Sequence, residues 1–224
     1  MKKTLLFLGL IFSLLSCRTS SVQTIAGSAV QTDSSFIDAE AARLKGDWEK
    51  ASNLYETFLQ QHPHNGAALF NLARIRMQHS SHYEAEKLSG KASEADPGNR
   101  YYREFYARAL LLNRQYKKAA AQYDFLMQHY PREEDYLYEF AMIQQMTRQD
   151  EKALESFNRL EDLMGFNEDL ILQKKTIELR LGHLEAAADE IRKLIAEDHS
   201  TARYDLMLAE LYDNAGQKEK ATAV

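Results

Sequence analysis

The sequence is poor in the residues that form cross-links and in the motifs that mark active sites. Its 224 residues include one cysteine, Cys17, so no disulfide within the chain can stabilise the fold. Neither a Gly-x-Ser-x-Gly motif nor a glycine-rich phosphate loop occurs. The single thiol ends an apolar N-terminal run. No other motif in the chain indicates a nucleophile beside an oriented base. We therefore expect no enzyme activity, no cofactor and no small-molecule substrate.

Proline and glycine are also scarce, with three and nine residues respectively. Both residues interrupt helices, whereas the helix-favouring residues alanine, leucine, glutamate, lysine and glutamine are plentiful. The composition therefore predicts an all-α protein whose long helices are joined by short turns.

The chain lacks the excess of basic residues that nucleic-acid binding requires. Its formal net charge is −5, and without Lys2 and Lys3 it keeps 26 basic against 33 acidic side chains, a net charge of −7. Proteins bind nucleic acids largely through lysine and arginine contacts to phosphate. We expect no nucleic-acid partner.

The N-terminal segment, MKKTLLFLGLIFSLLSC, has the features of a secretory targeting sequence. Two lysines precede an apolar run from Leu5 to Leu15, which is too short for an ordinary transmembrane helix. The end of this segment, LLSC, resembles the bacterial lipobox, in which the cysteine after the cleavage point is lipidated. The resemblance makes residues 1–16 a cleaved signal peptide and Cys17 the lipid-bearing first residue. A plain signal peptide and a buried structural thiol are the alternatives.

Residues 17–32 are predicted to be a flexible tether, because they are rich in serine, threonine and glutamine and poor in large apolar residues. Each buried CH₂ of an acyl chain contributes about 0.8 kcal/mol, so several chains on Cys17 would anchor the protein essentially permanently. No acidic cluster follows Cys17, as it does in the surface-export signals of Bacteroidetes lipoproteins. Arg18 is not the aspartate that retains enterobacterial lipoproteins in the inner membrane. The resemblance therefore implies the periplasmic face of the outer membrane.

The rest of the chain repeats every 34 residues. The three prolines, Pro63, Pro97 and Pro131, are 34 residues apart. Three further series share this period: Ala51, Ala85, Ala119, Ala153, Ala187 and Ala221; Ala39, Ala73, Ala107, Ala141, Lys175 and Ala209; and Tyr55, Ser89, Tyr123, Phe157 and Ile191. Internal repeats of this length indicate a solenoid, in which each unit buries its apolar face against its neighbours.

The pattern resembles the tetratricopeptide repeat (TPR), a helix, a short turn and a second helix with small residues at the helix crossing and a proline after the second helix. The first three copies are KGDWEKASNLYETFLQQHP, SSHYEAEKLSGKASEADP and RQYKKAAAQYDFLMQHYP. The resemblance covers residues 33–224. It implies a right-handed superhelical solenoid of about five and a half repeats.

The later repeats depart from this pattern. Gly165 and His199 stand at the proline positions, so a glycine and a polar turn are expected to end those helices. Lys175 replaces an alanine and makes close packing of the fifth repeat questionable, unless its stem snorkels. The sequence stops at Val224, within the second helix of the sixth repeat. A polar capping helix normally closes a solenoid, so we expect either a longer native protein or a partner over this end.

Two pairs of histidines could suggest a metal site. His62 and His64 flank a predicted helix end, where imidazole can bind terminal carbonyls. His79 and His82 span a predicted turn, and His82 takes the place of an aromatic residue in neighbouring repeats. No cysteine or well-placed carboxylate completes either pair, so we predict no metal site.

The resemblance also implies a groove, lined by the first helix of each repeat, that holds a segment of a partner protein. The matching positions in this sequence mix aromatic, methionine and arginine side chains, which protein interfaces enrich. They are Phe36, Phe70, Glu104, Tyr138 and Leu172, with Glu40, Arg74, Arg108, Met142 and Thr176 one turn later, and the series continue to Leu206 and Glu210. They lack the lysine and asparagine of the carboxylate clamp in chaperone-binding members. The alternative is that adjacent repeats partly bury Phe36, Phe70 and Tyr138.

Together these features predict a non-enzymatic, lipid-anchored scaffold for protein partners in the bacterial envelope. The combination is similar to the long TPR lipoproteins of Bacteroidetes, and it implies assembly of an envelope complex for secretion, gliding, pilus formation or outer-membrane assembly. Two alternatives remain open: an adaptor that regulates cell-wall hydrolases, and the targeting arm of a longer protein with a catalytic domain after Val224.

Overall fold

The computed structural model describes residues 34–197 and 202–224, and this part of the chain contains twelve α-helices and no strand. The helices are α1 (Ser34–Leu44), α2 (Trp48–Gln61), α3 (Gly66–Gln78), α4 (His82–Ala95), α5 (Arg100–Leu112), α6 (Tyr116–His129), α7 (Glu134–Met146), α8 (Asp150–Met164), α9 (Glu168–Leu181), α10 (Leu184–Glu197), α11 (Arg203–Asn214) and α12 (Lys218–Thr222). The predicted all-α class is confirmed. The predicted signal peptide, Cys17, the predicted tether and His199 lie outside the described residues.

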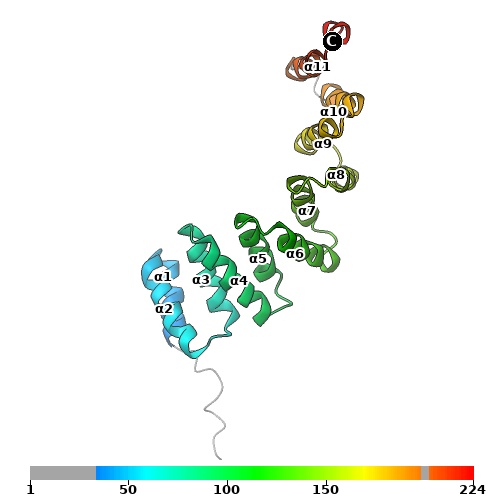
Figure 1. The fold of residues 1–224 in the computed structure, drawn as a ribbon. Coiled ribbons are helices and arrows are strands. Elements are labelled where there is room, and N and C mark those ends of the chain that lie inside the picture. The colour runs from blue at the N-terminus through cyan, green and yellow to red at the C-terminus, as the bar shows by residue number, and fades with distance from the viewer. Residues whose placement is uncertain (1–33, 198–201) are drawn as a thin grey trace, which may run out of the picture.

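The helices form consecutive pairs, each joined by a short turn. The second helix of the first pair begins at Trp48, and the second helices of the later pairs begin 34 residues apart, at His82, Tyr116, Asp150, Leu184 and Lys218. Neighbouring pairs lie side by side, so that the stack follows a curved path from α1 to α11 (Figure 1). This is a solenoid of helix-turn-helix repeats, as predicted.

The three prolines stand just after the second helices of the first three repeats. The cap residues His62, Asp96 and Tyr130 each precede a proline, and the backbone N–H of each cap donates to a carbonyl in the last turn. Proline cannot supply the next helical N–H, and it disfavours helical geometry in the residue before it. In the fourth repeat the helix ends at a glycine instead. Gly165 is the C-cap of α8, with φ 75° and ψ −154°.

Asparagines begin three of the first helices. The Oδ1 atoms of Asn65, Asn99 and Asn167 accept hydrogen bonds from the backbone N–H three residues later. These bonds satisfy donors that the helix start leaves free. Glu133 holds the same position before α7 but makes no cap bond. It pairs instead with Arg100, 2.8 Å away.

The turn inside each repeat contains one residue in the left-handed region, two positions before the second helix. The six residues are Gly46, Ser80, Arg114, Arg148, Gly182 and Gly216, with φ between 58° and 81°. Their spacing is 34 residues throughout. Glycine adopts this conformation without steric cost, whereas a residue with a Cβ is strained there. Three of the six turns therefore hold strain that the other three avoid.

The predicted small positions lie where helices cross. The alanines of both series are fully buried from Ala39 to Ala187, and Ala209 and Ala221 near the C-terminus are half-buried. The larger series, which includes Tyr55, Tyr123 and Phe157, is buried as well. Alanine at a crossing lets two helices approach closely, and the larger residues fill the space beside it.

The fifth repeat packs closely in spite of Lys175. Ile171, Ala187 and Ala188 are fully buried in one cluster of α9 and α10. Lys175 is half-buried with its amine 3.8 Å from the Sδ of Met207. The buried lysine of this repeat is the residue before it. Lys174 is 3% exposed and forms ion pairs with Glu161 and Glu190, and the sequence pattern did not predict this cluster.

Candidate functional site

The ten predicted groove residues occupy the first helices of five successive repeats. None of them is buried: Arg74, Arg108 and Thr176 are exposed and the other seven are half-buried. We call these ten positions the groove face; its members are Phe36, Glu40, Phe70, Arg74, Glu104, Arg108, Tyr138, Met142, Leu172 and Thr176. Each repeat contributes two residues one helical turn apart, so the face runs along α1, α3, α5, α7 and α9.

Neighbouring helices cover part of each aromatic ring on this face. The ring of Phe36 lies 5.3 Å from that of Phe58 in the same repeat, and Phe70 lies 4.9 Å from Tyr102 in the next one. Tyr138 packs edge-on against Phe157 at 6.1 Å. The partial burial that the sequence left as an alternative is therefore present, and a fraction of each ring stays open to a partner.

Glu40 is engaged inside the protein. Its carboxylate accepts hydrogen bonds from Arg43, Tyr55 and Asn71, which belong to α1, α2 and α3. Burial opposes the charge, but these hydrogen bonds together lower the pKa of Glu40. The residue therefore joins two repeats and is a poor candidate for contact with a partner.

The remaining members divide between packing and exposure. Met142 and Leu172 pack against the buried clusters of the fourth and fifth repeats. The hydroxyl of Thr176 donates to the carbonyl of Leu172 within α9. Arg74 is exposed, with its guanidinium 5.7 Å from the centre of the Phe70 ring. Arg74 is therefore free to meet a partner.

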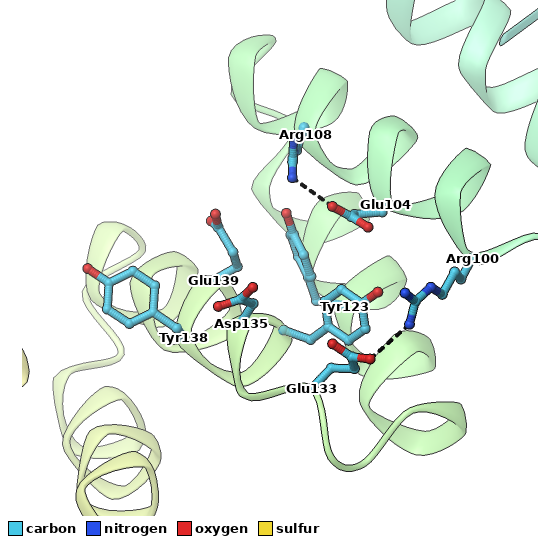
Figure 2. Close-up of a pocket in the computed structure, with 9 residues that line it drawn as sticks. Arg100, Glu104, Arg108, Tyr123, Glu133, Asp135, Tyr138 and Glu139 are labelled. Atoms are coloured by element: carbon cyan, nitrogen blue, oxygen red, sulfur yellow. Dashed lines mark hydrogen bonds and ion pairs between the residues drawn. The ribbon is translucent and has the colours of Figure 1, made fainter. Parts of the chain in front are cut away.

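A cavity of about 450 Å³ opens among α5, α6 and α7. Three groove-face residues, Glu104, Arg108 and Tyr138, line it, so the structure brings together side chains that are up to 34 positions apart. The other lining residues are Arg100, Tyr123, Glu133, Asp135, Tyr136 and Glu139 (Figure 2). This cavity is the candidate site.

Both arginines of the cavity are already paired. Arg108 Nη2 lies 2.6 Å from Glu104 Oε1, one turn away on α5. Arg100 Nη1 lies 2.8 Å from Glu133 Oε1, and this contact links α5 to the start of α7. Figure 2 shows the two ion pairs on the α5 side of the cavity. The positive charges of the site are therefore balanced within it.

Two carboxylates, Asp135 and Glu139, have no ion pair among the residues that the structure describes. Both stand on α7, one turn apart, and Figure 2 shows them next to one another between Tyr138 and α5. Burial is the main cause that raises the pKa of Glu139; Arg108 opposes the rise, and the negative charges of Asp135 and Glu104 add to it. The α7 side of the cavity is therefore acidic and incompletely compensated.

Tyr123 forms the floor of the cavity. The residue is 1% exposed, and its hydroxyl oxygen has no hydrogen-bond partner in the described part of the chain. Burial, reinforced by the charge of Glu139, raises the pKa of Tyr123, so the phenol stays neutral over the physiological range. A neutral phenol can both donate and accept a hydrogen bond.

Sequence reasoning found three of these nine residues and missed the others for identifiable reasons. Tyr123 belongs to the 34-residue series of Tyr55, whose members are buried, and the period gave no sign that this member also lines a cavity. Arg100 lies one turn before Glu104 on the same stripe of α5, so extending the groove series by four residues would have found it. Asp135 recurs in the sequence as Asp33 and Asp169, but this series was not among the groove positions. Glu139 carries no repeat signal, because the other repeats have different residues at its position.

The histidine pairs show no arrangement for metal binding. His62 caps α2, and its ring lies 4.5 Å from that of Phe58. His82 begins α4, the position that Trp48 and Tyr116 hold in α2 and α6. Within residues 34–197 and 202–224, no group of three or more histidine, cysteine, aspartate or glutamate side chains could hold a metal ion. No helix of the same ranges is both long and apolar enough to cross a membrane.

Comparisons with known proteins agree with the repeat architecture. Residues 42–109 match the family model described as the tetratricopeptide repeat. No curated protein matches the sequence at a significant level. Similar solved structures include MamA, with a TM-score of 0.66 and 16% identity over 78% of this chain and 96% of that one.

Two further structures have a similar fold. YrrB, described as a TPR protein with an unusual peptide-binding site, has a TM-score of 0.65 and 17% identity over 80% of this chain and 90% of that one. PilF of Pseudomonas aeruginosa has a TM-score of 0.56 and 16% identity over 85% of this chain and 87% of that one. At these identities the likeness concerns the fold.

Proposed function

Because this chain is a tetratricopeptide-repeat protein that folds as a helical solenoid, we propose that it is a non-enzymatic scaffold that binds a segment of a partner protein along its groove face. The observation that carries the proposal is the cavity among α5, α6 and α7, where three groove-face residues meet around about 450 Å³ of open space. Binding sites are typically concave and built from a few polar groups with aromatic walls. The peptide-binding site described for YrrB, which has a similar fold, supports this choice.

We further propose that the scaffold is lipid-anchored through Cys17 at the periplasmic face of the outer membrane and helps to assemble an envelope complex. The support is the sequence alone: an apolar run that ends in LLSC, followed by a polar stretch without an acidic cluster. A tether of this kind would hold the solenoid near the membrane while its groove face stays accessible to proteins.

Charge reversal on the groove face tests the binding proposal. Arg74→Glu with Arg108→Glu should remove the partners that chemical cross-linking captures from intact cells, because both guanidinium groups are exposed on the groove face. The matched control is Lys117→Glu with Lys118→Glu, which makes the same change in charge at exposed positions of α6. Circular dichroism checks that both variants fold. If the Arg variant keeps every partner that the control keeps, the groove face is not the binding surface.

Substitution of Cys17 tests the anchor. Wild-type protein should incorporate a clickable palmitate analogue and partition with membranes, whereas Cys17→Ser should do neither and should accumulate in the soluble fraction. Lipid incorporation by the Cys17→Ser variant would refute the lipoprotein interpretation.

A further inference from the structure

We infer that the cavity among α5, α6 and α7 receives a positively charged side chain, lysine or arginine, from the bound segment. The inference rests on the proposed function, since it names the chemistry of the residue that enters the site. The cavity is then the place where the solenoid selects one basic residue of the partner.

The charges that line the cavity favour a cation. Two arginines face four carboxylates: Glu104, Glu133, Asp135 and Glu139. Each arginine is paired with one of the first two. The carboxylates of Asp135 and Glu139 remain, side by side and without an ion pair among the described residues. A single ammonium or guanidinium group placed between them would compensate both charges.

The hydroxyl of Tyr123 supplies an independent sign that the site is incomplete. A buried polar group without a partner costs free energy, and native proteins leave few of them. The Tyr123 oxygen is such a group, and Tyr123 lines the cavity. An ammonium or guanidinium N–H can donate to this oxygen. Tyr136 and Tyr138 also line the cavity, and aromatic rings attract cations.

Other occupants fit the cavity less well. An anionic side chain would find both arginines already engaged and would approach four carboxylates. An apolar side chain would bury Asp135 and Glu139 further without a counter-charge, and burial of unpaired charges is costly. It would also leave the Tyr123 hydroxyl without a partner. A basic side chain avoids both penalties.

A small probe tests the inference without a known partner. Protein labelled with ¹³C-tyrosine is titrated with Nα-acetyl-lysine amide and, in parallel, with the neutral analogue Nα-acetyl-norleucine amide. The Tyr123 signal is assigned by its loss in Tyr123→Phe. We expect the lysine probe alone to shift the signals of Tyr123 and Tyr138 in a saturable way. The absence of a saturable shift, or an equal shift with the norleucine probe, overturns the inference.

Variants that remove charge test whether the lysine probe binds in this cavity. Asp135→Asn with Glu139→Gln should weaken the lysine probe about tenfold or more, since hydrogen bonds to charged groups are among the stronger polar contacts. The matched control, Glu151→Gln with Glu155→Gln, removes the same charge from exposed positions of α8 and should leave the titration unchanged. Equal weakening by both double variants would mean that general electrostatics, and not this cavity, attracts the probe.

Selection from a random peptide display library separates this inference from the proposed function. Bound peptides that share a lysine or arginine and are lost on Asp135→Asn with Glu139→Gln support both. Peptides that bind on the groove face without a shared basic residue overturn the inference and leave the function standing. If no peptide binds while the lysine probe still saturates, the cavity binds cations and the proposed function fails.

Discussion

The left-handed residue in the turn of each repeat gives a prediction that can be worked through in free energy. Arg114 has φ 58°, and its side chain makes no hydrogen bond or ion pair with the part of the chain that the structure describes. A residue with a Cβ pays about 1–2 kcal/mol for this conformation. Glycine avoids this cost but loses about 0.4–1 kcal/mol more chain entropy on folding. Arg114→Gly should therefore stabilise the protein by about 0.5–1 kcal/mol.

The reverse change should have the opposite sign. Gly182 has φ 81°, and no atom lies within 4 Å of the point where a Cβ would stand. Gly182→Ala therefore meets no steric clash, and backbone strain alone should destabilise the protein by about 0.5–1 kcal/mol. The matched control is Ala121→Gly, at an exposed position inside α6, where glycine should cost about 1 kcal/mol relative to alanine.

Urea unfolding followed by circular dichroism measures all three variants. The midpoint should rise for Arg114→Gly and fall for the other two, with unchanged slopes, because a change in slope would report partial unfolding of the repeat array. The reasoning is refuted if Arg114→Gly lowers the midpoint as Ala121→Gly does. It is also refuted if Gly182→Ala has no effect.

Three further predictions concern single side chains. Asn65→Ala should cost about 1 kcal/mol in urea unfolding, because the N–H of Ala68 loses its cap at 2.9 Å; no change in midpoint would contradict this role. Lys174→Met should cost about 3 kcal/mol by leaving Glu190 partly uncompensated in the interior, with Lys193 still 3.1 Å away, and a stability equal to wild type would show that the pair is dispensable. Burial raises the pKa of Glu139. The stability that this residue contributes is therefore fully present below its unfolded pKa and is lost as the pH rises through its folded pKa. Glu139→Gln should therefore raise the melting temperature at pH 7 but not at pH 4, and an equal gain at both would be inconsistent with this sign.

For much of the site, the sequence could predict which positions share a face but not which partners their side chains have. The resemblance to the tetratricopeptide repeat implied that Glu104, Arg108 and Tyr138 belong to one face, and the structure places all three around one cavity. The register could not show that Glu40 is bound by Tyr55 and Asn71, because those partners come from two other helices. The pair of Arg108 with Glu104, by contrast, follows from their spacing of four residues within α5.

The architecture was determined by local features that recur along the chain. Alanines every 34 residues allow close helix crossings, and prolines at the same period end the second helices, so each repeat specifies its own helix pair and its packing on the next. Only the tertiary structure decided how charges from different helices pair. Whether Asp135 and Glu139 are compensated, and whether the Tyr123 hydroxyl has a partner, depends on side chains that α5, α6 and α7 bring within a few ångströms of one another. Electrostatic and hydrogen-bond energies depend on those distances and on burial, which a repeat pattern does not contain.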